Sequence, residues 1–260
     1  MNFWFSEAQT PNVKLSIRVD RQLYSGKSEF QRIDVFESPE FGRFLTLDGY
    51  MMLTEKDEFI YHEMITHIPM AVHPHVKKVL VIGAGDGGVV RELARYPEIE
   101  AIDMVEIDPL VVEVCKKYLP QTACCLDDPR LNIHYEDGLK FIRFCEDEYD
   151  LIIVDSTDPF GPGEGLFTRE VYAEDANACQ RAHKNIASSF PIHKVYQAHI
   201  PTYPSGHWLF GFASKKYHPL RDLDETRWNL RGLRCRYYTT TLHKGAFYLP
   251  RYVEELLSDV

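Results

Sequence analysis

The sequence predicts an α/β fold in which a small N-terminal antiparallel β domain precedes a larger domain with a doubly wound, mainly parallel sheet. Two observations predict this fold: apolar and polar residues alternate through residues 12–54, and strand-like and helix-like segments alternate from residue 76 onward. A third observation is that the later strands are almost wholly apolar, which is typical of burial on both faces. We place the boundary near residue 57 and expect domains 1–57 and 58–260.

The N-terminal segment reads as a set of β-strands joined by turns. The expected strands are VKLSIRV, FQRIDVF, GRFLTL and YMMLT, with turn signals at Ser25-Gly26-Lys27, Ser38-Pro39 and Asp48-Gly49. Asp48-Gly49 is a strong hairpin signal, because both positions of such a turn favour a positive φ. The stretch DEFIYHEMITHIPMAVH then has helical spacing, and Asp57 is a candidate N-cap residue for this helix.

In the larger domain, strands alternate with helices. The expected strands are VKKVLVIG, AIDMVEI, LNIHYED and YDLIIVDSTD. Helices are expected through Tyr96, over 109–118 and from Gly138 onward. KVYQAHI and HWLFGFASK predict a final antiparallel pair.

Charge and composition limit the function classes. The 29 Lys and Arg against 39 Asp and Glu give a net charge of −10, which argues against nucleic acid and anionic membranes as partners and permits a cationic ligand. No apolar run reaches about 18 residues, and the start MNFWFSEAQT has no signal-peptide pattern, so we expect a cytoplasmic protein. Six cysteines without metal-binding spacing predict reduced thiols and no metal site.

A glycine-rich loop lies directly after the first strand of the larger domain and before a helix. It contains Gly83, Gly85 and Gly87 in the stretch GAGDGG. Glycines here let a ligand approach the backbone at the helix N-terminus. Glu106 ends the next strand, where an acid suits the two hydroxyls of a ribose. The pattern predicts nucleoside binding; a purely structural turn is the alternative.

Acidic residues follow four successive strands: Asp86, Glu106, Asp137 and Asp155. The carboxyl ends of parallel strands are where such sheets bind ligands, so these residues predict a strongly negative crevice. It would repel a pyrophosphate and attract a sulfonium nucleoside or a polyamine. Asp86 within the loop would disfavour the carboxylate of S-adenosylmethionine but suit a bare ammonium, as in decarboxylated S-adenosylmethionine. The alternative is that Asp86 only caps the following helix.

Several long motifs resemble the spermidine synthases, which are polyamine aminopropyltransferases. They are YSGKSEFQRIDVFES, FGRFLTLDGYMMLTEKDEFIYHEMITH, VLVIGAGDGGVVREL, VEIDPLVVE, DSTDPFGPGEGLFT, IPTYPSGHW and LHKGAFYLPRYV. The resemblance runs from about residue 3 to the end. It implies a Rossmann-like catalytic domain and transfer of aminopropyl from decarboxylated S-adenosylmethionine, a co-substrate, to putrescine. No further cofactor is implied, and a homodimer or homotetramer is expected.

The resemblance also implies residue roles on the nucleoside side. Gln31 would meet the nucleoside or its sulfur, and Glu106 would hold the ribose. Asp137 and Gly138 would contact the adenine, and Pro162 would line the adenosine site. From the residues alone, Gln31 would instead be a solvent-facing strand residue.

On the amine side, the resemblance makes Asp155 the proton acceptor and Asp86 the partner of the aminopropyl ammonium. The polyamine path would also include Tyr61, His62, Asp158 and Tyr203, with residues 158–165 forming a gate. The pattern alone allows a different interpretation, in which Tyr61 and His62 are helix residues that pack in the core and Tyr203 is a turn residue.

One departure from the family pattern follows Tyr172. Some two dozen residues, a helix and a fifth parallel strand, are absent, judged from the length of a helix-plus-strand unit. Loss of an interior strand would leave unpaired backbone groups within the sheet. We therefore expect that the complete protein contains this segment. We expect that disorder is the reason why the segment is absent from the present sequence.

Three alternatives remain open at this point. A methyltransferase would share the sheet and glycine loop but would not need Asp86 or the DSTDP strand end. A non-catalytic polyamine-binding protein would need only the acidic crevice. Within the enzyme class, cadaverine, agmatine or spermidine could replace putrescine as the acceptor.

Overall fold

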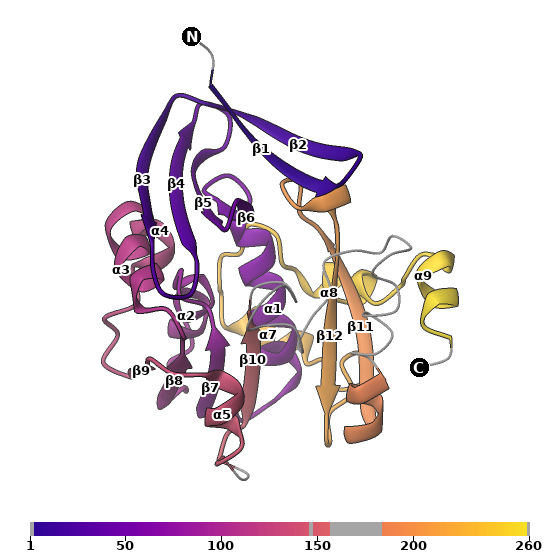
Figure 1. Ribbon diagram of the computed structural model, residues 1–260. Coiled ribbons are helices and arrows are strands. Elements are labelled where there is room, and N and C mark those ends of the chain that lie inside the picture. Colours follow the sequence, from indigo (N-terminus) through magenta and orange to yellow (C-terminus); the bar gives the residue numbers. More distant parts are fainter. Residues whose placement is uncertain (1–2, 146–147, 157–183, 259–260) are drawn as a thin grey trace.

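The computed structural model describes residues 3–145, 148–156 and 184–258. Its N-terminal part consists of two antiparallel sheets, β1-β2 and β3-β4-β5-β6 (Figure 1). The strands are β1 (Phe3–Thr10), β2 (Val13–Val19), β3 (Arg21–Lys27), β4 (Arg32–Ser38), β5 (Gly42–Leu47) and β6 (Tyr50–Thr54). Asp48 and Gly49 both have positive φ in the β5–β6 hairpin, as this turn requires.

Helix α1 (Glu58–Val72) follows β6 and begins at the expected place. Asp57 is its N-cap residue by position, but its side chain makes no capping bond. The carboxylate instead accepts hydrogen bonds from the Thr54 hydroxyl and from the amide and hydroxyl of Thr202. Asp57 therefore ties the start of α1 to a distant loop.

The larger part is built on a parallel sheet with the order β10-β7-β8-β9. Its strands are β7 (Lys78–Gly83), β8 (Ala101–Val105), β9 (Leu131–His134) and β10 (Leu151–Asp155). The intervening helices are α2 (Gly88–Ala94), α3 (Pro109–Tyr118), α4 (Pro120–Ala123) and α5 (Gly138–Ile142). The α/β class and the parallel sheet are confirmed.

Helices cover both faces of this sheet, as a doubly wound fold requires. Val79 and Val81 pack into the main core with residues of α1 and α2, whereas Leu80 and Ile82 face Phe141 and its neighbours in α5. Alternate residues of one strand point to opposite faces, so an all-apolar strand is buried on both.

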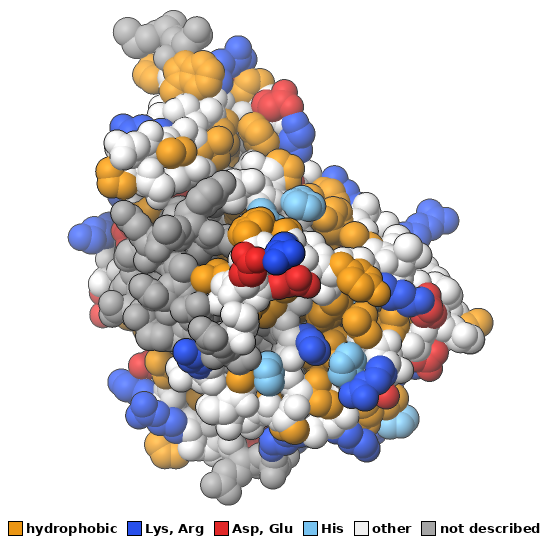
Figure 2. Space-filling model, turned by 90° about the vertical axis from the view of Figure 1, so that its right-hand side faces the viewer, with side chains coloured by type: hydrophobic (Ala, Val, Ile, Leu, Met, Phe, Trp, Pro, Cys, Tyr) orange, Lys and Arg blue, Asp and Glu red, His pale blue; other side chains and the backbone are white. Residues whose placement is uncertain are grey.

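The C-terminal part adds an antiparallel pair that forms a sheet of its own. Its elements are β11 (Ile192–His199), the short 3₁₀ helix η1 (Pro204–Gly206), β12 (His207–Ser214), α7 (Glu225–Leu230), α8 (Thr240–Ala246) and α9 (Arg251–Leu256). Residues 184–189 are also helical. Charged side chains of both signs are interspersed on the described part of the face that these elements form (Figure 2).

One sequence prediction about the N-terminal strands was wrong, and one strand was missed. Ser25-Gly26-Lys27 is not a turn but the end of β3, where Gly26 pairs with Ile33 of β4. The turn lies just after it, where the Ser28 hydroxyl accepts the amides of Phe30 and Gln31. The strand β1 was not predicted at all, although it pairs with β2 along almost its whole length.

The structure also bears on the expected domain boundary, membrane spans and cysteines. The apolar core is continuous from Ile33 of β4 to α1 and the parallel sheet, so the division at residue 57 stays a prediction. The expected extra segment after Tyr172 falls outside the described residues. Among those described, no helix is long and apolar enough to cross a bilayer, and the five cysteines are free.

Candidate active site

The glycine loop is bound directly to the end of β10. Gly83 and Ala84 have φ values of +84° and 64°, and the Ala84 amide donates to the carbonyl oxygen of Asp155 at 2.9 Å. A Cβ atom on Gly83 would lie 2.0 Å from that same oxygen, so only glycine fits. Gly87, with φ +86°, is the N-cap of α2. The loop therefore brings Asp86 beside Asp155.

Three titratable side chains converge at this point. His62 Nε2 of α1 lies 3.2 Å from Asp86 Oδ1. One possible ligand atom from each of His62, Asp86 and Asp155 lies within 4.8 Å of the other two. The side chains of His62 and Asp86 are only 3% and 15% exposed. These distances place the side chains of Asp86 and Asp155 in one small cluster.

His62 carries the positive charge in this cluster. Burial lowers its pKa, but the charges and hydrogen bonds of Asp86 and Glu58 outweigh burial and raise the pKa to about 10. For Asp86, burial raises the pKa, yet the adjacent imidazolium produces a net lowering. The pair is therefore an imidazolium and a carboxylate at neutral pH.

Asp155 has the opposite character. Burial and the negative charge of Asp86 raise its pKa to about 6, although His62 and a hydrogen bond with Tyr61 act against this shift. Its Oδ2 atom is buried and has no hydrogen-bond partner among the described residues. A carboxylate with a raised pKa and a free oxygen is suited to accept a proton.

Aromatic side chains form one wall of the site. The Tyr61 and Tyr203 rings meet edge to face at 6.1 Å, and Tyr203 packs on Trp208 at 4.8 Å. The Tyr203 hydroxyl donates to the Met52 carbonyl oxygen at 2.6 Å, which links β6 to the loop after β11. Tyr203 is thus more than a turn residue, because its ring is held against Tyr61.

Glu106 lies at the end of β8, where its carboxylate binds the glycine loop. Oε2 accepts from the Gly85 amide at 3.1 Å, and Oε1 accepts from the Asp108 amide at 2.9 Å. Burial, with the charges of Asp108 and Asp155, raises its pKa to about 7 despite these two bonds. Glu106 is thus positioned beside the loop, as the sequence predicted.

Gln31 lies beside Asp108, which follows Glu106 by two positions. Its Nε2 donates to Asp108 Oδ2 at 3.0 Å, and the Ser28 hydroxyl donates to the same oxygen at 2.7 Å. Asp108 was not predicted from the sequence, although an Asp before Pro109 at the start of a helix was a signal for it. Asp108 joins the turn between β3 and β4 to the segment that follows β8.

The remaining predicted nucleoside residues are less closely connected. Asp137 caps α5 by accepting the Leu139 amide at 2.8 Å. A Cβ on Gly138 would approach Ile82 Cγ2 to 2.4 Å, so the glycine allows close packing on β7. Asp158 and Pro162 lie outside the described residues, as does the expected gate.

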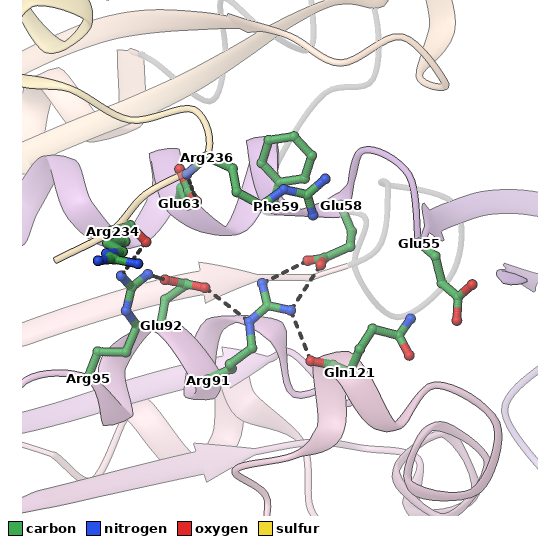
Figure 3. Close-up of a pocket in the computed structure, with 10 residues that line it drawn as sticks. All are labelled: Glu55, Glu58, Phe59, Glu63, Arg91, Glu92, Arg95, Gln121, Arg234 and Arg236. Carbon is green, nitrogen blue, oxygen red and sulfur yellow. Dashed lines mark hydrogen bonds and ion pairs between the residues drawn. The ribbon is translucent and has the colours of Figure 1, made fainter. Parts of the chain in front are cut away.

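Sequence reasoning missed two charged residues next to the site. Glu58 bonds to His62 Nδ1 at 2.5 Å and to Arg91 through both guanidinium Nη atoms at 2.9 Å. Figure 3 shows Arg91 between Glu58, Glu92 and Gln121 in a pocket of about 230 Å³. Glu58 and Arg91 are 33 positions apart, so no local sequence pattern could pair them. Asp86 also accepts the Gly88 amide at 2.8 Å, so the same carboxylate binds the start of α2 and lies against His62.

Comparison with protein families agrees with this arrangement. Residues 58–181 match the spermine/spermidine synthase domain. Residues 3–55 match the family model described as the spermidine synthase tetramerisation domain.

Curated relatives share most of the sequence. A polyamine aminopropyltransferase of Alkaliphilus oremlandii is 65% identical over 279 positions, which cover 99% of this chain and 98% of that protein. One from Clostridium perfringens is 63% identical over 282 positions, covering 100% and 99%. These 282 positions exceed the 260 residues of this chain by 22.

Solved structures show the same fold. A spermidine synthase in complex with the transition-state analogue AdoDATO has a TM-score of 0.92, 41% identity, and coverage of 99% of this chain and 96% of its own. The spermidine synthase of Thermotoga maritima has a TM-score of 0.94 and 39% identity, with coverage of 99% and 95%. The chain belongs to the spermidine synthase family and is a polyamine aminopropyltransferase enzyme.

Proposed function

We propose that this enzyme transfers the aminopropyl group of decarboxylated S-adenosylmethionine to putrescine, giving spermidine and 5′-methylthioadenosine. The observation that carries the proposal is the convergence of Asp86 and Asp155 at the ends of adjacent parallel strands, with ligand atoms within 4.8 Å. The reaction brings together a sulfonium, an ammonium and an amine that must lose a proton. A half-buried pair of carboxylates, one ionised and one with a raised pKa, suits this set of charges.

The donor would lie along the glycine loop. Glu106 would bind the ribose hydroxyls, Gln31 would approach the nucleoside, and Asp137 and Gly138 would lie beside the adenine. Asp86 would pair with the ammonium of the aminopropyl tail. A tail that ended in a carboxylate as well would meet the Asp86 carboxylate in a buried site, where like charges repel strongly. This repulsion favours the decarboxylated donor over S-adenosylmethionine itself.

The acceptor would lie between the aromatic wall and Asp155. An alkyl amine has a pKa of about 10.4 in water, so it arrives as an ammonium without a lone pair. Transfer of a proton to Asp155 frees the lone pair, which forms the new N–C bond. The C–S bond breaks, and its electron pair stays on sulfur as a neutral thioether. Tyr61, Asp158 and Tyr203 would hold the amine about 3–3.5 Å from that carbon. His62 would lie along the polyamine path and act on it through Asp86.

We propose no metal and no cofactor beyond the co-substrate. His62, Asp86 and Asp155 together are a donor set that a divalent cation can use. However, His62 has a carboxylate at each ring nitrogen, and an imidazole protonated at both nitrogens has no lone pair for a metal. An ammonium ion is therefore the better cation for this site.

Assembly and location complete the proposal. The match of residues 3–55 to a tetramerisation domain supports a homo-oligomer, which we propose to be a dimer or tetramer. Cytoplasmic location, compatible with five free cysteines in the described residues, stays a prediction.

Product analysis tests the proposal. The chain would be incubated with decarboxylated S-adenosylmethionine and, separately, putrescine, cadaverine, agmatine and spermidine, with mass spectrometry of the products. We expect methylthioadenosine and spermidine, with putrescine the best acceptor. Production of S-adenosylhomocysteine from S-adenosylmethionine would instead indicate a methyltransferase. Ligand binding without any turnover would indicate a binding protein, and a better acceptor than putrescine would overturn the acceptor assignment.

A further inference from the structure

A line of buried ion pairs runs from a surface pocket into the proposed active site. Arg91 of α2 binds both oxygens of Glu58, each at 2.9 Å. Glu58 Oε2 lies 2.5 Å from His62 Nδ1, and His62 Nε2 lies 3.2 Å from Asp86 Oδ1. The side chains of Glu58 and His62 are 4% and 3% exposed, so water does not satisfy either.

We propose that Glu58 is a positioning residue: its bond to Nδ1 keeps the His62 ring doubly protonated and oriented so that Nε2–H holds the Asp86 carboxylate toward the substrate ammonium. The proposal rests on the function proposed above and adds a residue to it. Glu58 would touch neither substrate, because His62 lies between it and Asp86.

The positions of the two carboxylates favour a doubly protonated ring. A neutral imidazole carries one N–H and one acceptor nitrogen, so it can donate to a single carboxylate only. His62 has a carboxylate oxygen next to each nitrogen, and only the imidazolium donates to both. If Glu58 were neutral, the ring could satisfy Asp86 as a neutral tautomer and would be free to lose its charge.

The groups around His62 fit this role. Besides Glu58 from α1 and Asp86 from the glycine loop, Asp155 faces His62 from β10. Tyr61 lies beside it on the same helix, and its ring meets the imidazole edge to face at 5.6 Å. The first turn of α2 closes the remaining side, because a Cβ on Gly88 would lie 2.2 Å from His62 Cε1. The ring cannot move in that direction.

His62 and Arg91 together keep Glu58 ionised. Burial raises the pKa of Glu58, but the bonds to His62 and Arg91 produce a net lowering. Arg91 is itself fixed by Glu92 at 3.0 Å and by the Gln121 carbonyl oxygen at 3.1 Å. Glu58 is thus a carboxylate of fixed position. The positive charges of His62 and Arg91 on either side reduce the free-energy cost of burying it.

Glu58→Gln tests the proposal, because it removes the charge and keeps the shape. Glu55→Gln is the matched control: Glu55 lines the same pocket but bonds to the Arg43 amide rather than to His62. The first readout is the ¹⁵N spectrum of histidine-labelled protein between pH 7 and 9, with a His62→Asn variant to assign the signals. We expect two protonated His62 nitrogens in the parent and in Glu55→Gln, and a neutral ring at pH 9 in Glu58→Gln.

The second readout is turnover. The kcat of Glu58→Gln relative to the parent should fall about tenfold further between pH 7 and pH 9, because His62 loses its proton and Asp86 loses the positive charge beside it. A purely structural role for Glu58 would give a ratio that does not change with pH. The ratio for Glu55→Gln should stay constant over the same range.

Either of two results would overturn the proposal. The first is a neutral His62 ring in the unmodified protein at pH 8, a measurement that does not depend on the variant folding. The second is a Glu58→Gln protein whose His62 stays doubly protonated at pH 9, or whose activity ratio stays flat. If the parent transfers no aminopropyl group, the proposed function fails, while the spectra still decide the Glu58–His62 relation.

Discussion

At the scale of single residues, the Asp86 side chain fills both of the roles that the sequence allowed for it. It caps α2 through the Gly88 amide and also lies against His62 in the site. The sequence alone could not decide between these roles, because both need an acid at the same position. The pairing of Asp86 with His62 depends on the contact between α1 and the glycine loop, which local patterns do not encode.

Asp86→Asn should change the choice of donor. Loss of the carboxylate removes a charge-assisted bond to the aminopropyl ammonium, so affinity for decarboxylated S-adenosylmethionine should fall about 10–100-fold. Binding of S-adenosylmethionine, no longer repelled, should weaken less or improve. Calorimetric titration of both ligands measures this ratio, with the exposed Asp20→Asn as the control. Equal losses for the two ligands would contradict the role of Asp86.

The raised pKa values predict a specific pH dependence. Asp155 must be ionised to accept a proton, and its pKa of about 6 means that kcat should fall as the pH drops through about 6 rather than 4. His62, with a pKa of about 10, stays charged over this range. Glu106, with a pKa of about 7, should affect the KM for the nucleoside instead. Steady-state kinetics between pH 5 and 8 separates the two effects, and a kcat that holds constant down to pH 5 would argue against Asp155.

At the scale of elements, local sequence patterns were sufficient where the turn residues dictate the chain path. β2, β5, β6 and α3 have the bounds that the sequence predicted, and Asp48-Gly49 and Pro109 mark their ends. The last three residues of β3, 25–27, were mistaken for a turn because Gly26 resembles a turn residue, and only their pairing with β4 makes them part of the strand. Long-range pairing thus overrode a local signal.

Two glycines with the same φ of +84° predict very different effects of substitution. Gly83→Ala places a Cβ 2.0 Å from the Asp155 carbonyl oxygen, whereas Gly49→Ala meets nothing within 4 Å. Both variants incur left-handed strain of about 1–2 kcal/mol. Only Gly83→Ala should add a further cost of about 1–3 kcal/mol from the clash, and it should also lose nucleoside binding. Denaturant unfolding checks the difference, and equal losses would show that the loop is not held against β10.

At the scale of the whole molecule, one edge of the parallel sheet is formed by a strand that is expected in its interior. Among the described residues β10 is an edge strand with Ile152 44% exposed, and β11-β12 form a separate sheet. A relative aligns over 282 positions against 260 residues here. Both facts agree with the expected lack of a helix-plus-strand segment, although the stretch around Tyr172 lies outside the described residues.

Intact mass spectrometry of the native protein tests the expected segment. The printed sequence sums to 30.2 kDa. If the complete protein contains the additional helix and strand, its mass should be higher by about 2–3 kDa, as expected for such a unit. A mass of 30.2 kDa would show that the chain folds without this strand.

The central claim is that the half-buried Asp155 carboxylate takes the proton of the attacking amine. Asp155→Asn keeps the shape of the side chain but cannot accept that proton. We predict that kcat falls about 10²–10⁴-fold while the affinity for methylthioadenosine is nearly unchanged. The exposed Asp127→Asn, whose partner is Lys116, serves as the control and should retain full activity. Turnover that survives in Asp155→Asn while nucleoside binding is lost would contradict the account.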